Sequence, residues 1–290
     1  GWNPWAAICS CPSRLRHPPV KTAAVPSPAD PETAYINDLW IEKGTPAFMK
    51  TVLALFSGGF ATFALLYCVQ PMMPLLSKEF AINAAQSSLV LSVATGMLAF
   101  GLLITGPVSD RIGRKPVMVF ALVCAALCTI ASAVMPSWEL VLATRALVGL
   151  SLSGLAAVAM TYLSEEIHPQ HIGLAMGLYI GGNAIGGMSG RLITGVLIDF
   201  VSWHTAMLTI GGLALVAALR FWKVLPQSRN CRPQATHPRS LLDRRAGHRK
   251  DARPPSLFLE AFLPFGASVT PSHYIPHRLP PHPYHLHQPP

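Results

Sequence analysis

The stretch Gly106-Pro107-Val108-Ser109-Asp110-Arg111-Ile112-Gly113-Arg114-Lys115 decides the fold of this chain of 290 residues. It places four charged residues within six positions, and the long runs on either side are apolar and almost uncharged. Charges inside the hydrocarbon of a bilayer are costly, so the stretch predicts a tight aqueous turn between two membrane-spanning helices. Its three basic residues favour the cytoplasmic side of the membrane.

The composition of the whole chain also indicates a membrane protein. The chain is 51% hydrophobic and 12% charged, whereas soluble domains average about 25% charged residues. Its net charge is +9, but the basic residues gather at the turn and after residue 222, without interleaved aromatic residues. This pattern argues against nucleic acid as a partner. The sequence has no nucleophile–base pair, phosphate loop or zinc-ligand spacing, and therefore predicts no enzyme activity, cofactor or metal site.

Six apolar runs predict six transmembrane helices. A helix needs about 20 residues to cross a hydrocarbon core of about 30 Å, and each run is close to that length. The runs are rich in Ala, Leu, Met and Gly and lack two-residue alternation, which argues against strands. They cover residues 49–69, 87–105, 116–135, 139–162, 172–200 and 205–224. The predicted fold class is therefore an all-α membrane protein with a six-helix bundle at residues 46–226.

The segments on either side of this bundle differ from it in composition. Residues 1–45 are Pro-rich, polar and without period, and they predict a disordered tail. Residues 227–255 are basic and predict a cytoplasmic loop. Residues 256–290 begin like a seventh span that prolines then interrupt, and a proline inside a helix costs about 3 kcal/mol. We expect an aberrant Pro- and His-rich tail there, with the remnant of a seventh span, as a frameshift would produce.

The basic residues also predict the orientation of the bundle. They gather before the first run, in the 106–115 turn and after the sixth run, while most other connections carry few of them. Cytoplasmic loops hold an excess of Lys and Arg. Both ends of the bundle, and with them the N-terminus, are therefore expected in the cytoplasm.

Six residues of the turn resemble the signature of a known family. These residues match the pattern G-x-x-x-D-R-x-G-R-K of the major facilitator superfamily, and they are Gly106, Asp110, Arg111, Gly113, Arg114 and Lys115. In that family the signature joins helices 2 and 3 on the cytoplasmic side. The resemblance covers about residues 46–230. It implies the N-terminal half of a twelve-helix fold, built from two inverted three-helix repeats.

The resemblance implies a function and a set of partners. The chain is similar to bacterial inner-membrane facilitators of the drug- or sugar-efflux type, which are secondary transporters working by alternating access and usually driven by protons. The expected partners are the lipid bilayer, a small-molecule substrate, protons and a second six-helix half. Asp110 would act in a conformational latch, facing a helix N-terminus of that half, where the helix dipole favours negative charge. The alternative is an inactive half-transporter, or a membrane subunit without transport activity of its own.

The fourth apolar run carries a further match. Arg145, followed by Gly149 and Gly154, resembles the helix-4 R-x-x-x-G signature, which the family links to proton coupling. An arginine inside a span must find a carboxylate, a carbonyl group or water. An arginine that reaches the outer interface, or that holds a helix contact, is the alternative interpretation.

The end of the fourth run resembles another family motif. Residues 162–169 read Tyr-Leu-Ser-Glu-Glu-Ile-His-Pro and are similar to the Y-x-x-E…P loop, in which a glutamate joins a charge network with the turn. We therefore expect Glu165 or Glu166 to pair with Arg111 or Arg114. A solvated acidic loop is the alternative.

The fifth run is the richest in glycine. Gly182, Gly186 and Gly190 are four residues apart, a spacing that lets helix backbones approach closely in lipid. The stretch from Gly182 to Gly187 is similar to the G-P-x-x-G-G core of the helix-5 signature of proton-driven antiporters, with Asn183 in place of proline. Close helix packing by these glycines alone is the alternative.

The resemblance also suggests substrate contacts, because helices 1 and 4 line the cavity in this family. The candidates are Tyr67, Gln70, Arg145 and Asn183. For Tyr67 an interfacial position is the alternative. Arg191 is a second cation within a span, and it is expected to pair with Asp199 or to reach the outer surface.

Overall fold

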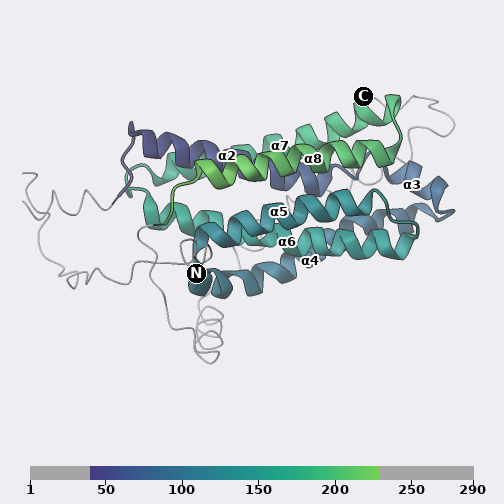
Figure 1. Cartoon of the computed structure of the whole chain (residues 1–290), viewed down its shortest axis with the longest axis horizontal. Helices are drawn as coiled ribbons and strands as arrows, with labels where there is room; N and C mark the ends of the chain where they lie inside the picture. The colour runs from purple at the N-terminus through teal and green to yellow at the C-terminus, as the bar shows by residue number, and fades with distance from the viewer. Residues whose placement is uncertain (1–39, 229–290) are drawn as a thin grey trace, which may run out of the picture.

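The computed structural model describes residues 40–228, and the regular elements within them are α-helices. The long helices lie side by side along the long axis of the molecule, and the short helix α3 lies near one end (Figure 1). The elements are α2 (Pro46–Tyr67), α3 (Met73–Glu79), α4 (Ala84–Ile112), α5 (Arg114–Ser132), α6 (Trp138–Glu166), α7 (Ile172–Phe200) and α8 (Trp203–Val224). The predicted all-α membrane fold is confirmed. The predicted tails at 1–45, 227–255 and 256–290 lie outside the described residues, except for 40–45 and 227–228.

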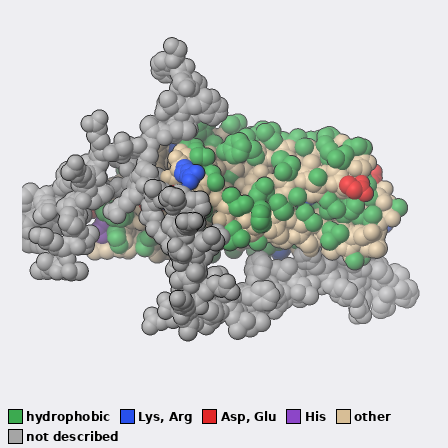
Figure 2. Space-filling model, turned by 90° about the horizontal axis from the view of Figure 1, so that it is seen from below, with side chains coloured by type: hydrophobic (Ala, Val, Ile, Leu, Met, Phe, Trp, Pro, Cys, Tyr) green, Lys and Arg blue, Asp and Glu red, His purple; other side chains and the backbone are tan. Residues whose placement is uncertain are grey.

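Five of the long helices, α2, α4, α5, α6 and α8, are long and apolar enough to cross a membrane by length and composition. The sixth, α7, has 29 residues, as many as α4 and α6. Its glycines, Asn183 and Arg191 make it less apolar, yet many of its leucine and isoleucine side chains are exposed. Figure 2 shows hydrophobic side chains over most of the visible described surface, with charged side chains near its ends. Such a surface suits contact with lipid.

The helices associate in two groups of three. In Figure 1, α2, α7 and α8 lie together, and α4, α5 and α6 lie together. Contacts between α5 and α8 and between α2 and α6 join the groups. One group thus consists of helices that are consecutive in the sequence, whereas the other joins α2 from the start of the bundle to α7 and α8 from its end.

The charged turn is shorter than the sequence predicts. Helix α4 continues through Pro107 and Asp110 to Ile112, and α5 begins at Arg114. Only Gly113 breaks the helical path, with φ of 107°, a conformation that glycine adopts without steric cost. The prediction of a tight turn over residues 106–115 was therefore wrong in extent. Polar residues at a helix end need no loop when they lie beyond the apolar part of the bundle. For the same reason Glu165 and Glu166 lie in the last turn of α6 rather than in a loop.

The glycine row of α7 lies directly against α2. A Cβ atom added to Gly182 or Gly190 would come within 2.6 and 2.7 Å of backbone atoms of Phe56 and Ala64, respectively. A Cβ on Gly186 would meet the backbone of Phe60 still more closely. The close approach that the four-residue spacing predicts is therefore present, and any larger side chain in this row would push the two helices apart.

Candidate functional site

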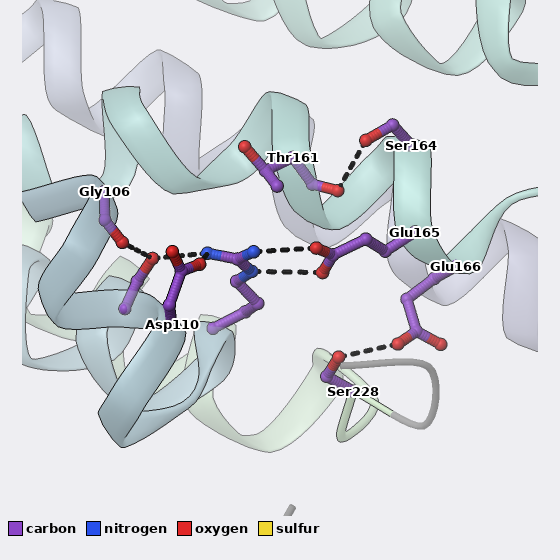
Figure 3. Close-up of polar contacts among 9 residues, drawn as sticks. Gly106, Asp110, Thr161, Ser164, Glu165, Glu166 and Ser228 are labelled. Carbon is purple, nitrogen blue, oxygen red and sulfur yellow. Dashed lines mark hydrogen bonds and ion pairs between the residues drawn. The ribbon is translucent and has the colours of Figure 1, made fainter. Parts of the chain in front are cut away.

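The residues of the signature turn form a charge network centred on Arg114, at the start of α5. Its Nη1 atom lies 2.6 Å from Asp110 Oδ1, while its Nη2 and Nε atoms donate to the two carboxylate oxygens of Glu165 at 2.7 and 3.0 Å. Figure 3 labels the two carboxylate residues that bind this guanidinium group, Asp110 on α4 and Glu165 on α6. Two-fold pairing of arginine with a carboxylate is among the stronger polar interactions. The network therefore ties together three helices, and the predicted pairing of Glu165 with Arg114 is confirmed.

Ser109 also belongs to this network, although no motif in the sequence points to it. Arg114 Nη1 donates to Ser109 Oγ at 2.6 Å, and Ser109 Oγ donates to the carbonyl oxygen of Gly106 at 2.7 Å. The side chain is fully buried. Ser109 occupies a variable position of the signature, so its only sequence signal is a hydroxyl at the end of an apolar helix, where it can bond a carbonyl of the preceding turn.

Lys115 of the turn and Glu166 at the end of α6 contact the segment that follows α8. Lys115 Nζ donates to the carbonyl oxygen of Leu225 at 2.6 Å, and Glu166 Oε1 accepts from Ser228 Oγ at 2.6 Å. Arg111 is exposed. Glu166 thus holds the segment after α8 rather than contributing a second carboxylate to Arg114. The sequence did not predict these contacts.

Arg145 lies fully buried in α6 and contacts the end of α2. Its Nη2 atom donates to the carbonyl oxygens of Leu65 and Leu66 at 3.1 and 2.9 Å. These carbonyl groups belong to the last turn of α2, where backbone N–H partners are lacking, and the carbonyl oxygen of Leu65 also accepts from Cys68 Sγ at 3.2 Å. Arg145 Nε and Nη1 have no hydrogen-bond partner among residues 40–228. The side chain therefore holds a helix contact, as one of the two alternatives predicts, and it does not extend to the surface.

The candidate substrate contacts are brought together only in part. Tyr67 ends α2, with 6% of its surface exposed, and its ring lies under Arg191 of α7 at 4.4 Å from centroid to Cζ. Gln70 lies in the turn after α2 and is also buried. Asn183 lies further along α7, where its Oδ1 atom faces Gly59 and has no hydrogen-bond partner in the described part of the chain.

Arg191 does not form the expected pair with Asp199. Arg191 forms no ion pair within residues 40–228, and it lies over the ring of Tyr67 instead. The sequence did not predict this contact, because no local rule relates two residues on different helices.

The family model "Major Facilitator Superfamily" matches residues 55–280 of the chain. The chain belongs to the major facilitator superfamily. The match contains the signature turn, the Arg114 network and all of α4 to α8. As a member of this superfamily the chain is an integral membrane protein.

Relatives and a solved structure extend this assignment. The chain is 55% identical to "Inner membrane transport protein YnfM" of Escherichia coli over 90% of its length and 63% of the relative, so it spans less than two thirds of that relative. It is 35% identical to "4-hydroxybenzoate transporter PcaK" of Pseudomonas aeruginosa over 53% of its length and 35% of the relative. The crystal structure of the human organic anion transporter MFSD10 matches 69% of the chain and 53% of that protein, with a TM-score of 0.56 and 19% identity. This likeness supports the facilitator fold.

Proposed function

We propose that the chain provides six helices of a secondary transporter that moves a small molecule across the bacterial inner membrane by alternating access. The proposed mode is proton-coupled export, and the proposed partner is a second six-helix half. The ends of the bundle that hold the signature turn then face the cytoplasm, as the distribution of basic residues favours. Membership of the superfamily and the 55% identity to an inner-membrane transport protein support this proposal.

The observation that carries the proposal is the Asp110–Arg114–Glu165 network. Arg114 binds Glu165 with two nitrogen atoms and Asp110 with one. The Asp110 side chain keeps 24% of its surface exposed, compared with 7% for Arg114. An exposed carboxylate of this kind can meet the positive N-terminal end of a helix from another half. Asp110 is therefore the proposed contact of the latch, and Arg114 and Glu165 hold it in place.

Proton coupling is assigned to Arg145, Glu165 and Glu166. Arg145 places a fixed positive charge inside the bundle, with two guanidinium nitrogen atoms that no described residue accepts from. Buried charges of this kind mark ion pathways in membrane proteins. Glu165 and Glu166 lie at the opposite end of the same helix, so one helix connects the buried cation to the carboxylates near the turn.

The proposed substrate is a small organic molecule, and two classes compete. The resemblance to drug- and sugar-efflux facilitators favours a neutral or cationic compound. The 35% identity to a protein named for 4-hydroxybenzoate transport favours an organic acid. The two classes differ in charge, so a substrate panel separates them.

The test is substrate-driven proton movement in vesicles that contain the full chain and a pH-sensitive dye. The expected result is a change of internal pH when 4-hydroxybenzoate, a sugar or a cationic drug is added, absent from empty vesicles. If the helices are inserted and no compound changes the internal pH beyond the empty control, transport by this chain is refuted. The alternative of a membrane subunit without transport activity of its own would then hold.

A further inference from the structure

Two matched rows of side chains face each other where α2 meets α7, and they form what we call the α2–α7 seam. In each row the residues are four positions apart, so they share one edge of their helix. The seam consists of Gly59, Phe63 and Tyr67 on α2 and of Asn183, Gly187 and Arg191 on α7.

The rows are in register along the seam. Asn183 Oδ1 lies against Gly59, and a Cβ atom on Gly187 would be 3.2 Å from the Tyr67 ring and 3.8 Å from Phe63. Arg191 Cζ lies 4.4 Å from the centroid of the Tyr67 ring. Glycine at position 187 thus leaves room for the Tyr67 ring, and the ring in turn lies against the Arg191 guanidinium group.

Arg191 carries a charge that the described residues do not neutralise. It forms no ion pair within residues 40–228, and its buried Nε atom has no hydrogen-bond partner there. The next carboxylate along α7, Asp199, is about 12 Å further along the helix at about 1.5 Å per residue. A cation inside a span is costly without a counter-charge, and stacking on an aromatic ring is worth only about 0.5–2 kcal/mol.

Arg145 provides a contrast within the same bundle. Its guanidinium group donates to two backbone carbonyl groups of α2, which compensate part of its charge. Arg191 has no such carbonyl contact in the described part of the chain, although it also lies beside α2. Asn183 adds a second unpartnered polar atom to the seam. The seam therefore holds polar groups in fixed positions, and its positive charge has no anion beside it among the described residues.

We infer that Arg191, held by Tyr67, binds the carboxylate of a small organic acid, which is the substrate class of this transporter. The planar guanidinium group presents paired N–H donors that match the two oxygens of a carboxylate. The Tyr67 ring covers one side of the group, so the carboxylate approaches from another side. The inference rests on the proposed transport function, because a bound acid is a substrate only if the chain transports it.

The test is direct binding to the purified full chain in detergent, measured by calorimetry with 4-hydroxybenzoate and with its neutral analogue 4-hydroxybenzamide. Wild-type chain is expected to bind the acid and to bind the amide at least about tenfold more weakly, because Arg191 is half-buried and a hydrogen bond between charged groups contributes about 1.5–3 kcal/mol. Arg191→Gln is expected to weaken binding of the acid by a similar factor. Arg191→Lys, which keeps the charge and loses the planar fork, is expected to weaken it less.

The matched control is Arg220→Gln, which removes the same charge from an exposed position on α8. It is expected to leave acid binding unchanged. The inference is overturned if wild-type chain does not bind the acid, if it binds the amide equally well, or if Arg191→Gln binds the acid like wild type. If Arg191→Gln does not fold, the inference is still tested by comparing acid with amide binding to wild-type chain, and by acid binding to Arg191→Lys. Binding in detergent needs no transport, so acid binding without proton movement in vesicles would refute the transport proposal alone.

Discussion

Arg145 of α6 donates a hydrogen bond of 2.9 Å to the carbonyl oxygen of Leu66, in the last turn of α2. A second bond from the same nitrogen atom reaches the carbonyl oxygen of Leu65. A buried arginine thus serves as a cap for the C-terminal end of another helix, where unpaired carbonyl groups attract positive charge. The contact fixes the end of α2, from which Tyr67 projects toward α7.

Arg145→Ala is expected to destabilise the bundle. The change removes both bonds to α2 and leaves a cavity in a fully buried position. Large-to-small changes in cores lower the free energy of unfolding by about 2–5 kcal/mol. Unfolding in detergent, followed by tryptophan fluorescence, measures the change. The exposed Arg220→Ala is the control and is expected to stay within about 0.5 kcal/mol of wild type; equal stability of both variants would contradict the capping role.

Arg114→Gln and Glu165→Gln are expected to be coupled rather than additive. Each single change breaks the two-fold pair between α5 and α6, and the second change then has little left to break. A double-mutant cycle of unfolding free energies is expected to give a coupling of about 1–2 kcal/mol. Additive effects would mean that the pair contributes nothing to holding the turn.

Ser109→Ala is expected to lower the free energy of unfolding by about 1 kcal/mol, because Arg114 loses a buried hydrogen-bond partner. Ser88 provides a matched control on the same helix. Its hydroxyl donates to a carbonyl group in the preceding turn, as Ser109 does, but Ser88 is only half-buried and this bond is exposed to solvent or lipid. Ser88→Ala is expected to be nearly neutral. The role of Ser109 would be refuted if both changes had the same effect.

Gly186→Ala is expected to destabilise the packing of α7 on α2. The added Cβ atom would collide with the backbone of Phe60, and overpacking of this kind costs about 1–3 kcal/mol. Gly181→Ala is the control, because Gly181 lies in the same helix and an added Cβ atom there meets nothing within 4 Å. The control is expected to unfold at the same temperature as wild type or slightly above it. Thermal unfolding that does not distinguish the two variants would contradict close packing by the glycine row.

Much of the fold was predictable because lipid imposes a simple pattern on sequence. Apolar runs of helical length and the distribution of charges predicted the helices, and the spacing of Gly182, Gly186 and Gly190 predicted the close contact of α7 with another helix. The pairing of Glu165 with Arg114 followed from family resemblance, not from spacing. The substrate contacts, the latch and proton coupling remain predictions.

Other features could not be read from the sequence because they depend on tertiary contacts. The sequence did not show that α4 continues through the charged stretch to Ile112, since charged residues at a helix end and in a loop have the same composition. It did not place Ser228 against Glu166 or Arg191 on Tyr67. Both contacts join residues far apart in the chain, and only the packed bundle brings them together.

Asp110→Asn tests the central claim most directly, through proton movement in vesicles. The substitution keeps the size of the side chain and removes its negative charge, while the Arg114–Glu165 pair remains. The account predicts substrate-driven proton movement by wild-type chain, and a large loss of it in Asp110→Asn with a stability change below about 1 kcal/mol. Proton movement by Asp110→Asn at the wild-type rate would contradict the role of Asp110 in the latch. If wild-type chain is inserted in the vesicles and no proton movement is observed, the proposal of transport itself is contradicted.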